Sequence, residues 1–269
     1  MNGEVVVVRS GGDIASGVIQ KLHRTGFRVL VLEMDQPTSI RRTVCFSEAV
    51  YADKMEIEGI TAVLVKNIVE TYHAWANDFV PVMVDTKEEY IKHFNPLAVV
   101  DAIIAKRNTG MNKNLAPITI GIGPGFEAGK DVDVVIESNR GHNLGRLIFH
   151  GNAESNTGMP GNICGYTTER VLKAPDDGVI LLNRKIGDTV KRGDIIAQVN
   201  DESIEAQIDG IVRGLIREGT HVTKGLKVGD IDPRIKELNN CYTISDKARA
   251  IGGAVLEAIL IEMRRIKNQ

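Results

Sequence analysis

Four polar side chains that could perform acid–base chemistry lie close together in the middle of the chain. The ten-residue stretch ESNRGHNLGR holds Glu137, Arg140, His142 and Arg146. A histidine near a carboxylate can transfer protons, and arginines hold an anionic substrate in place. A turn pinned by salt bridges would use the same residues without catalysis. We predict a site here, with Glu137, Arg140 and His142 in catalytic roles and Arg146 in binding.

A glycine-rich run precedes these residues. Residues 117–165 contain ten glycines, and the run begins with Gly121, Gly123 and Gly125. Successive backbone N–H groups without side chains can form a concave nest that binds anions. The sequence therefore predicts that these three glycines contact the anionic part of a cofactor.

A further candidate binding site lies near the N-terminus, in the sequence GGDIASG. The dinucleotide-binding fingerprint is GxGxxG after a strand, with an acidic residue about twenty positions later. Gly11 and Gly12 fit the tight turn, and Glu33 fits the acid that binds a ribose hydroxyl. Asp13 replaces the second glycine of the fingerprint, and its carboxylate would repel a pyrophosphate. Nucleotide binding by these residues and a purely structural helix start both remain open.

Isolated cations and one cysteine give weaker signals. Arg41 and Arg42 could grip a phosphate in the loop after the second strand, or form a solvated basic pair. Lys106, at the end of a short predicted helix after Asp101, could meet a phosphate or act as a general acid, or merely complement the helix dipole. Cys164 is flanked by loop residues, where exposure favours thiolate chemistry, although such cysteines are more often inert.

Hydrophobic runs predict the elements that position these residues. Buried strands are expected at 4–9, 27–32, 80–84, 97–100 and 131–137. A helix is expected over 14–22, with Gly26 as its C-cap glycine. An amphipathic helix is expected from Ser245 to the end of the chain. The strand–glycine turn–helix–strand order at the N-terminus is typical of a doubly wound α/β domain.

Residues 174–232 contain an internal repeat with an offset of 32 residues: DGVI at 177–180 matches DGIV at 209–212, and two GxxVxxG segments match in the same register. Two such halves predict a small β module like the domains that carry biotin or lipoate. Between Arg192 and Lys224 the chain has no lysine, so no covalent biotin or lipoate is expected.

The predicted fold class is therefore α/β plus β. A Rossmann-like parallel-sheet domain is expected over 1–115, a glycine-rich middle segment over 116–172, a C-terminal barrel-sandwich module of the biotinyl/lipoyl type over 173–233, and a terminal helical segment over 234–269.

Composition gives no general reason to expect binding to nucleic acid or a membrane. The chain is 43% hydrophobic and 25% charged, with a net charge of −2. No signal peptide or membrane span is expected, because the apolar run near the N-terminus has only four valines. Three separated cysteines without a CxxC pair favour a cytoplasmic location and predict no metal site.

Several motifs together resemble a known family. VVVVRSGGDIASG, PTSIRRTVCFSEAVY, VDAIIAKRN, IGIGPGFEAGKDVDVVIESNRGHNLGR and TISDKARAIGGAVLEAIL are similar to accessory proteins of selenium-dependent molybdenum hydroxylase systems. The N-terminal half is loosely similar to the NAD(P)-binding domains of xanthine dehydrogenase accessory factors. The resemblance implies a cytoplasmic factor that helps to mature a molybdenum hydroxylase and has that enzyme or its maturation proteins as partners.

The ligand and the class of function stay open beside this resemblance. NAD(P), another nucleotide and a molybdopterin-type cofactor are the candidate ligands. One alternative function is an NAD(P)-dependent oxidoreductase, and another is a non-catalytic adaptor that docks a partner through the β module. Whether the chain is an enzyme and whether it forms a homo-oligomer are also left open.

Overall fold

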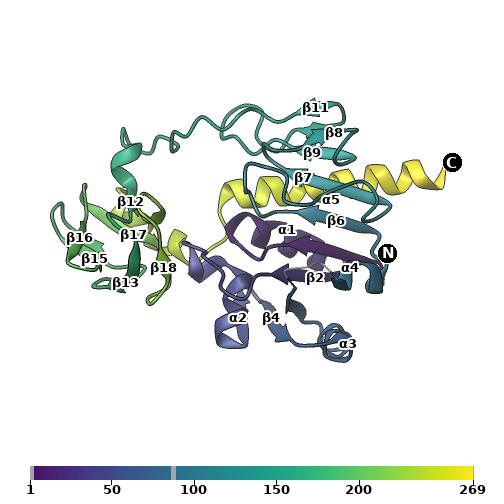
Figure 1. The fold of residues 1–269 in the computed structure, drawn as a ribbon. Coiled ribbons are helices and arrows are strands. Elements are labelled where there is room, and N and C mark those ends of the chain that lie inside the picture. Colours follow the sequence, from purple (N-terminus) through teal and green to yellow (C-terminus); the bar gives the residue numbers. More distant parts are fainter. Residues whose placement is uncertain (1–2, 86–88, 269) are drawn as a thin grey trace. The chain divides into compact units, whose positions relative to one another are not determined.

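The computed structural model describes residues 3–85 and 89–268 of the chain (Figure 1). It divides into two compact units, each assembled from segments distant in the sequence. The first unit comprises Met1–Pro37, Cys45–Asn156 and Ile244–Gln269, and the second comprises Thr38–Val44 and Thr157–Thr243.

The first unit is built on a nine-stranded mixed sheet in the order β10-β9-β7-β6-β1-β2-β5-β4-β3. All neighbouring pairs from β9 to β4 are parallel, whereas β10 and β3 pair antiparallel at the two edges. The strands are β1 (Val5–Arg9), β2 (Arg28–Glu33), β3 (Lys54–Ile57), β4 (Ile60–Val65), β5 (Val80–Val84), β6 (Ala98–Asp101), β7 (Ile118–Ile122), β9 (Val134–Ile136) and β10 (Leu147–Ile148). A separate ribbon pairs β8 (Glu127–Ala128) with β11 (Gly151–Asn152).

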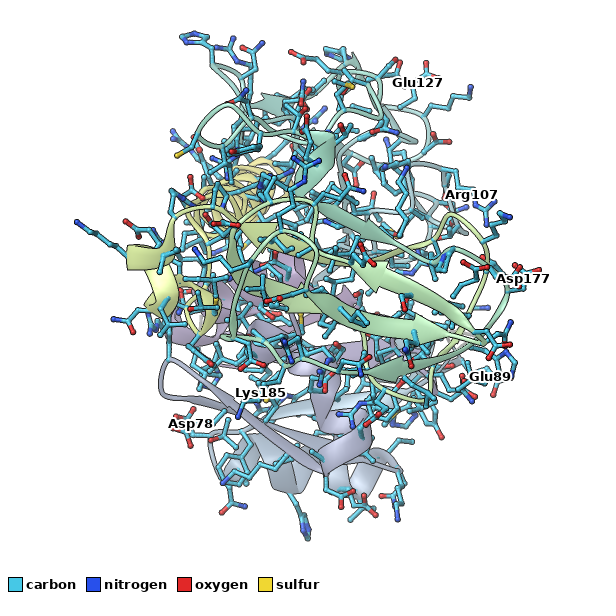
Figure 2. All side chains as sticks on the ribbon, turned by 90° about the vertical axis from the view of Figure 1, so that its left-hand side faces the viewer. Asp78, Glu89, Arg107, Glu127, Asp177 and Lys185 are labelled. Atoms are coloured by element: carbon cyan, nitrogen blue, oxygen red, sulfur yellow. The ribbon has the colours of Figure 1, made fainter. Side chains whose placement is uncertain are left out.

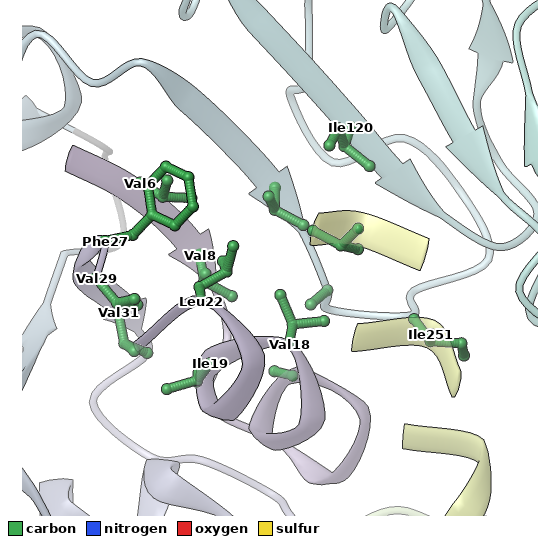
Figure 3. Packing of buried hydrophobic residues seen from close by; sticks show 14 of the residues in the cluster. Val6, Val8, Val18, Ile19, Leu22, Phe27, Val29, Val31, Ile120 and Ile251 are labelled. Atoms are coloured by element: carbon green, nitrogen blue, oxygen red, sulfur yellow. The ribbon is translucent and has the colours of Figure 1, made fainter. Parts of the chain in front are cut away.

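Helices cover both faces of this sheet. The helices are α1 (Asp13–Arg24), α2 (Ala49–Ala52), α3 (Ile68–Ala76), α4 (Glu89–Phe94) and α5 (Asp246–Lys267). Val6 and Val8 of β1 pack in one core with α1 and α5, as Figure 3 shows for α1. Val7, between them, points to the other face and packs in a core with α3 and α4. Alternate residues of a strand face opposite sides, so a continuous valine run suits a sheet covered on both sides.

Two helix boundaries follow the signals expected from the sequence. Ser245 caps α5, because its side-chain oxygen accepts a hydrogen bond from the Ala248 N–H at 3.2 Å. Gly26, with φ +87°, follows the last residues of α1 and donates its N–H to the His23 carbonyl.

The second unit contains two four-stranded antiparallel sheets, β12-β19-β17-β14 and β16-β15-β13-β18. Their strands are β12 (Val171–Lys173), β13 (Gly178–Leu182), β14 (Thr189–Val190), β15 (Ile195–Val199), β16 (Glu202–Glu205), β17 (Gly210–Leu215), β18 (His221–Val222) and β19 (Lys227–Asp232). Strands β13, β14 and β15 recur as β17, β18 and β19, and Gly178 pairs with Val222 while Gly210 pairs with Val190. Each half of the repeat therefore lends a short strand to the sheet of the other half.

The predicted fold class is wrong in its division of the chain. The glycine-rich middle segment is not a separate part, because β7, β9 and β10 extend the same sheet that begins at β1, and this sheet is mixed rather than parallel. The terminal helix α5 packs on this sheet as well.

No separate barrel-sandwich module is formed either. The unit that holds the two four-stranded sheets also takes in residues 38–44 and the 3₁₀ segment Ile235–Cys241. The Leu215 N–H donates to the Ile40 carbonyl at 2.8 Å, which ties β17 to a segment about 175 residues earlier. Local hydrophobic pattern cannot reveal such long-range exchange of segments.

Across residues 3–85 and 89–268, no helix is both long enough and apolar enough to cross a membrane.

Candidate functional site

The order in which successive strands are added to the sheet reverses at β1. From β1 the chain passes through α1 to β2 on one side, and it later returns to place β6 on the other side of β1. In open α/β sheets, ligands bind outside the carboxyl ends of the strands at such a reversal. The loops that follow β1 and β6 are therefore the first place to look for a site.

A buried ion pair joins the ends of these two strands. The Arg9 guanidinium, 6% exposed, pairs with the Asp101 carboxylate, 2% exposed. Arg9 also donates to the Thr109 carbonyl at 2.9 Å, and the second Asp101 oxygen accepts the Ile103 N–H at 3.1 Å. Arg9 thus fastens the loop after β6 to the end of β1.

The same two loops hold unusual backbone conformations. Ser10 after β1 has φ +83°, and Ile104 and Lys106 after β6 have φ +60° and +61°. Residues with a Cβ adopt this region at a cost, and a β-branched residue such as Ile104 is a clear outlier. Such strain concentrates at ligand-binding and active sites.

Glu33 ends β2 next to these loops. Its carboxylate accepts hydrogen bonds from the Gly11 N–H at 2.8 Å and the Met34 N–H at 2.9 Å. Burial raises the pKa of Glu33, while the hydrogen bonds from Gly11, Met34 and the Ser10 hydroxyl oppose that rise. Glu33, the predicted ribose-binding acid, therefore lies against the predicted nucleotide-binding turn. Its carboxylate is hydrogen-bonded to that turn through Gly11 and Ser10.

The predicted residues Gly11, Gly12 and Asp13 form a tight helix start. The Gly11 N–H is taken by Glu33, the Gly12 N–H donates to the Ser10 hydroxyl, and Asp13 is the first residue of α1. A Cβ on Gly11 would lie 2.6 Å from the Ser47 nitrogen, so glycine is required for packing. These contacts give the turn a structural explanation that needs no pyrophosphate.

The predicted anion-binding glycines are also explained by packing. A Cβ on Gly121 would lie 2.5 Å from the Phe126 ring, and one on Gly125 would lie 2.6 Å from the Arg107 backbone. The Gly123 N–H donates to the Ile136 carbonyl at 2.8 Å. Gly125 thereby lets the loop after β7 touch the loop after β6.

The predicted catalytic residues of the middle segment lie on the loop after β9. Glu137 is buried there, whereas Arg140 and His142 are exposed. Glu137 is 2% exposed, and its two oxygens accept the N–H groups of Asn139 at 2.6 Å and Glu154 at 2.7 Å. Arg140 makes a two-pronged ion pair with Asp246 of α5, at 2.7 and 3.0 Å. This pair lowers the pKa of the Asp246 carboxyl well below its usual range.

His142 and Arg146 occupy the exposed turn of that loop. The Arg146 carbonyl accepts the Glu137 N–H at 2.9 Å, which closes the loop through its backbone. The structure gives a scaffolding role to Glu137 and leaves the predicted roles of His142 and Arg146 as predictions.

Lys247, in the first turn of α5, connects two of the predicted sites. Burial is the main cause that lowers the pKa of Lys247, and the charge of Arg140 adds to it. The charges of Asp13, Glu137 and Asp246 oppose that decrease. Asp13 from the N-terminal turn thus shares one charged cluster with Glu137 and Arg140 from the middle segment.

The remaining predicted cations divide between the two units. Lys106 and the adjacent Arg107 are exposed on the loop after β6, and the Arg107 side chain extends to solvent in Figure 2. Arg41 and Arg42 belong to the second unit. Arg41 donates to the Asn240 and Thr243 carbonyls, and Arg42 to the Leu215 carbonyl at 2.7 Å. These contacts fix the segment 38–44 to the second unit.

Three residues of this region, Arg9, Ser10 and Lys247, were not predicted as site residues, and Asp101 was predicted only as the end of a strand. The sequence does mark Arg9 and Asp101, because each is a charged residue at the end of an otherwise apolar strand. Nothing local marks Lys247, because its environment depends on the crossing of α1 and α5. Within the described part of the chain, no group of three or more histidine, cysteine, aspartate or glutamate side chains is arranged to hold a metal ion.

No family model matches the chain. An uncharacterized protein of Escherichia coli (strain K12), YqeB, is 50% identical over 262 residues, which cover 97% of this chain and 48% of YqeB. The chain therefore spans about half the length of the curated relative that it matches.

Similar solved structures have low scores. They include the product-bound ectoine utilization protein EutE (DoeB) from Ruegeria pomeroyi, with 11% identity, a TM-score of 0.24 and 86% of each chain covered. A succinylglutamate desuccinylase/aspartoacylase from Rhodobacter sphaeroides has 11% identity, a TM-score of 0.27 and 86% of each chain covered. TM-scores in this range support no inference about fold or activity.

These comparisons correct the family assignment made from the motifs. The relative that aligns with nearly the whole chain is an uncharacterized protein and carries no assignment to molybdenum hydroxylase systems. The resemblance to accessory proteins of selenium-dependent molybdenum hydroxylases is wrong, and so is the maturation role drawn from it. The oxidoreductase and adaptor alternatives gain no support either.

Proposed function

We propose that the first unit binds a small, polyhydroxylated organic anion at the carboxyl ends of β1, β2 and β6. The observation that carries this proposal is the placement of Ser10, Ile104 and Lys106. All three adopt left-handed backbone conformations in the two loops on either side of the chain reversal. Strain of this kind persists only where the surroundings impose it, which is the usual condition at a ligand site.

Glu33 supplies the hydroxyl recognition in this proposal. A carboxylate has about four acceptor positions, of which two on Glu33 take backbone N–H groups and a third takes the Ser10 hydroxyl. The remaining position suits a hydroxyl group of a sugar-like ligand. The two bound N–H groups also fix the orientation of the carboxylate before any ligand arrives.

Lys106 and Arg107 supply the charge complement. They are adjacent, exposed cations on the loop that Arg9 fastens through Thr109. Gly125 of the neighbouring loop packs closely against the Arg107 backbone, where a Cβ would overlap it. A loop held at both positions presents its cations without a large ordering cost on binding.

Calorimetric titration with gluconate, ribose phosphate and glucose phosphate tests the proposal. At least one of these probes should bind, and Lys106→Ala should weaken its binding about tenfold or more, because a hydrogen bond to a charged group contributes about 1.5–3 kcal/mol. Glu33→Gln should weaken it as well, since an amide nitrogen replaces one acceptor oxygen.

Lys66→Ala is the matched control, because Lys66 directly follows β4 at the same edge of the sheet, away from the reversal. Its variant should bind the probe as the wild type does. The proposal is overturned if none of the three probes binds, or if Lys66→Ala weakens binding as much as Lys106→Ala.

A further inference from the structure

One exposed side of helix α5, which we call its outer face, is formed by Glu257, Leu260, Ile261 and Arg264. Leu260 and Ile261 are adjacent, and each is 41% exposed. The buried residues of the same part of the helix lie on its opposite side: Val255, Ala258, Ile259 and Glu262. In Figure 1 the last turns of α5 reach past the strands of the sheet. The described part of the chain therefore leaves two large aliphatic side chains of α5 facing water.

A carboxylate and a guanidinium flank this aliphatic pair on the same face. Leu260, Ile261 and Arg264 follow Glu257 at the i+3, i+4 and i+7 positions, which share one side of a helix. Glu257 and Arg264 are both exposed. They are separated by roughly two helical turns, which is too far for them to pair with each other.

Neither charge has an opposite charge within reach along the helix. The positions three and four residues away from Glu257 or Arg264 hold Gly253, Ala254, Leu260, Ile261, Lys267 and Asn268. By contrast, Arg265 does find a carboxylate one turn earlier, because it pairs with Glu262 at 3.7 Å. Among residues 3–85 and 89–268, Glu257 and Arg264 form no ion pair. The outer face thus carries two opposite charges whose partners must come from another molecule.

The outer face is complementary to a reversed copy of itself. The midpoint between Leu260 and Ile261 is also the midpoint between Glu257 and Arg264. A twofold axis through that point, with the two helices antiparallel, sets Glu257 of each copy opposite Arg264 of the other copy. The same axis sets Leu260 opposite Ile261, so the aliphatic pairs cover each other. A uniformly acidic or basic partner would instead meet one charge of its own sign.

We propose that the outer face of α5 pairs two copies of this chain, antiparallel, in a symmetric dimer. The paired segment is short, so the buried area lies at the low end of specific protein interfaces. The dimer should therefore be in exchange with the monomer, with a dissociation constant in the micromolar range. The inference does not depend on the ligand site, because the outer face belongs to the second half of α5, whereas that site is formed by the loops after β1, β2 and β6.

Sedimentation velocity of the intact chain over a dilution series tests the dimer. Wild type should dimerise, and Leu260→Lys should remove the dimer while circular dichroism shows an intact fold. Glu257→Arg and Arg264→Glu should each weaken dimerisation about tenfold, because the twofold axis turns two attractive pairs into two repulsive ones. Lys92→Glu is the matched control for Arg264→Glu. It makes the same change of charge on α4, which packs on the other face of the sheet, and should leave dimerisation unchanged.

Mixing the two charge variants tests the antiparallel register. Glu257→Arg and Arg264→Glu proteins, combined in equal amounts, should form a mixed dimer about as tightly as wild type, because both cross-copy pairs are again of opposite sign. The double variant Glu257→Arg with Arg264→Glu should also dimerise like wild type, since it only exchanges the two charges. Wild type that stays monomeric throughout the series overturns the proposal. So does a dimer that persists in Leu260→Lys, or a mixture no more dimeric than its separate components.

Discussion

Gly252 of α5 lies directly against Gly17 of α1, and a Cβ on Gly252 would overlap the carbonyl oxygen of Gly17. The two helices therefore touch through their backbones on one face of the sheet. This close approach brings the first turn of α5, and with it Lys247, to the turn that follows β1. The packing of two glycines thus determines which charged groups meet at the carboxyl edge.

Gly252→Ala should lower the free energy of unfolding by about 1–3 kcal/mol, because a methyl group forces the two helices apart. Gly253→Ala is the matched control, since a Cβ at Gly253 meets no atom within 4 Å. That variant should be more stable than wild type by about 0.5–1 kcal/mol, because alanine favours a helix over glycine. Chemical denaturation measures both, and equal effects of the two substitutions would contradict the backbone contact.

Arg9→Met should destabilise the protein by about 3–5 kcal/mol, because it leaves the Asp101 carboxylate buried without its cation. The double variant Arg9→Met with Asp101→Leu should recover much of that loss, since no unpaired charge remains. Denaturant titration of the single and double variants provides the check. A double variant no more stable than Arg9→Met alone would show that the pair is not the source of the effect.

Ser10→Gly should have a free energy of unfolding about 1 kcal/mol higher than that of Ser10→Ala, because both variants lose the hydroxyl and only glycine adopts φ +83° without strain. The same variant should bind the proposed ligand more weakly, since the turn is then free to relax when empty. Ser10→Ala keeps the strained conformation without the hydroxyl. Thermal unfolding and calorimetric titration of both variants separate these effects.

Glu33→Gln should change how stability depends on pH. Because burial raises the pKa of Glu33 above 4.5, the folded chain keeps a proton that the unfolded chain has already lost. The stabilisation from the protonated carboxyl is complete below 4.5 and is lost as the pH rises through the raised pKa. The free energy of unfolding of wild type minus variant should therefore decrease from acidic to neutral pH, as followed by denaturant titrations. A constant or increasing difference contradicts this.

Asp246→Asn should show the opposite slope. Arg140 lowers the pKa of Asp246 below its ordinary 3.8, so the ionised carboxylate stabilises the fold above that pH. That stabilisation is lost as the pH falls through the lowered value. Wild type minus variant should therefore increase as the pH rises through the acidic range, which acid titration of both proteins followed by circular dichroism can measure.

Local elements were predictable where a single segment determines its own structure. The valines of β1, the capping oxygen of Ser245 and the glycine after α1 each act within a few residues, and the structure places them as expected. The internal repeat is likewise visible in the structure, because β17 begins 32 residues after β13, the strand that it matches in the repeat. The assembly of these elements was not predictable in the same way. Residues 38–44 belong to the second unit although both flanking segments belong to the first, and α5 belongs to the first unit although it follows a segment of the second.

The sequence predicted only the general position of the polar residues near the carboxyl ends of the strands, and the roles given to them stay predictions. Asp13, Glu33, Glu137 and Arg140 do lie at the carboxyl ends of the strands or beside them. The glycines at 121, 123 and 125 were assigned to a ligand, whereas close contacts with Phe126, Ser138 and Arg107 account for them. A glycine can either bind a ligand through its backbone or permit close packing, and the sequence does not show which atoms pack against it. The position of Lys247 depends on the α1–α5 crossing, which no local pattern reveals.

Hydrogen–deuterium exchange with the tightest-binding of the three hydroxylated probes tests the central claim most directly. The claim predicts slower exchange in the loop that begins at Ser10 and in the loop 102–110, with no change in the peptide that contains Lys66. Protection confined to other parts of the chain, or no protection at a saturating concentration of the probe, would contradict a ligand site at the carboxyl ends of β1 and β6.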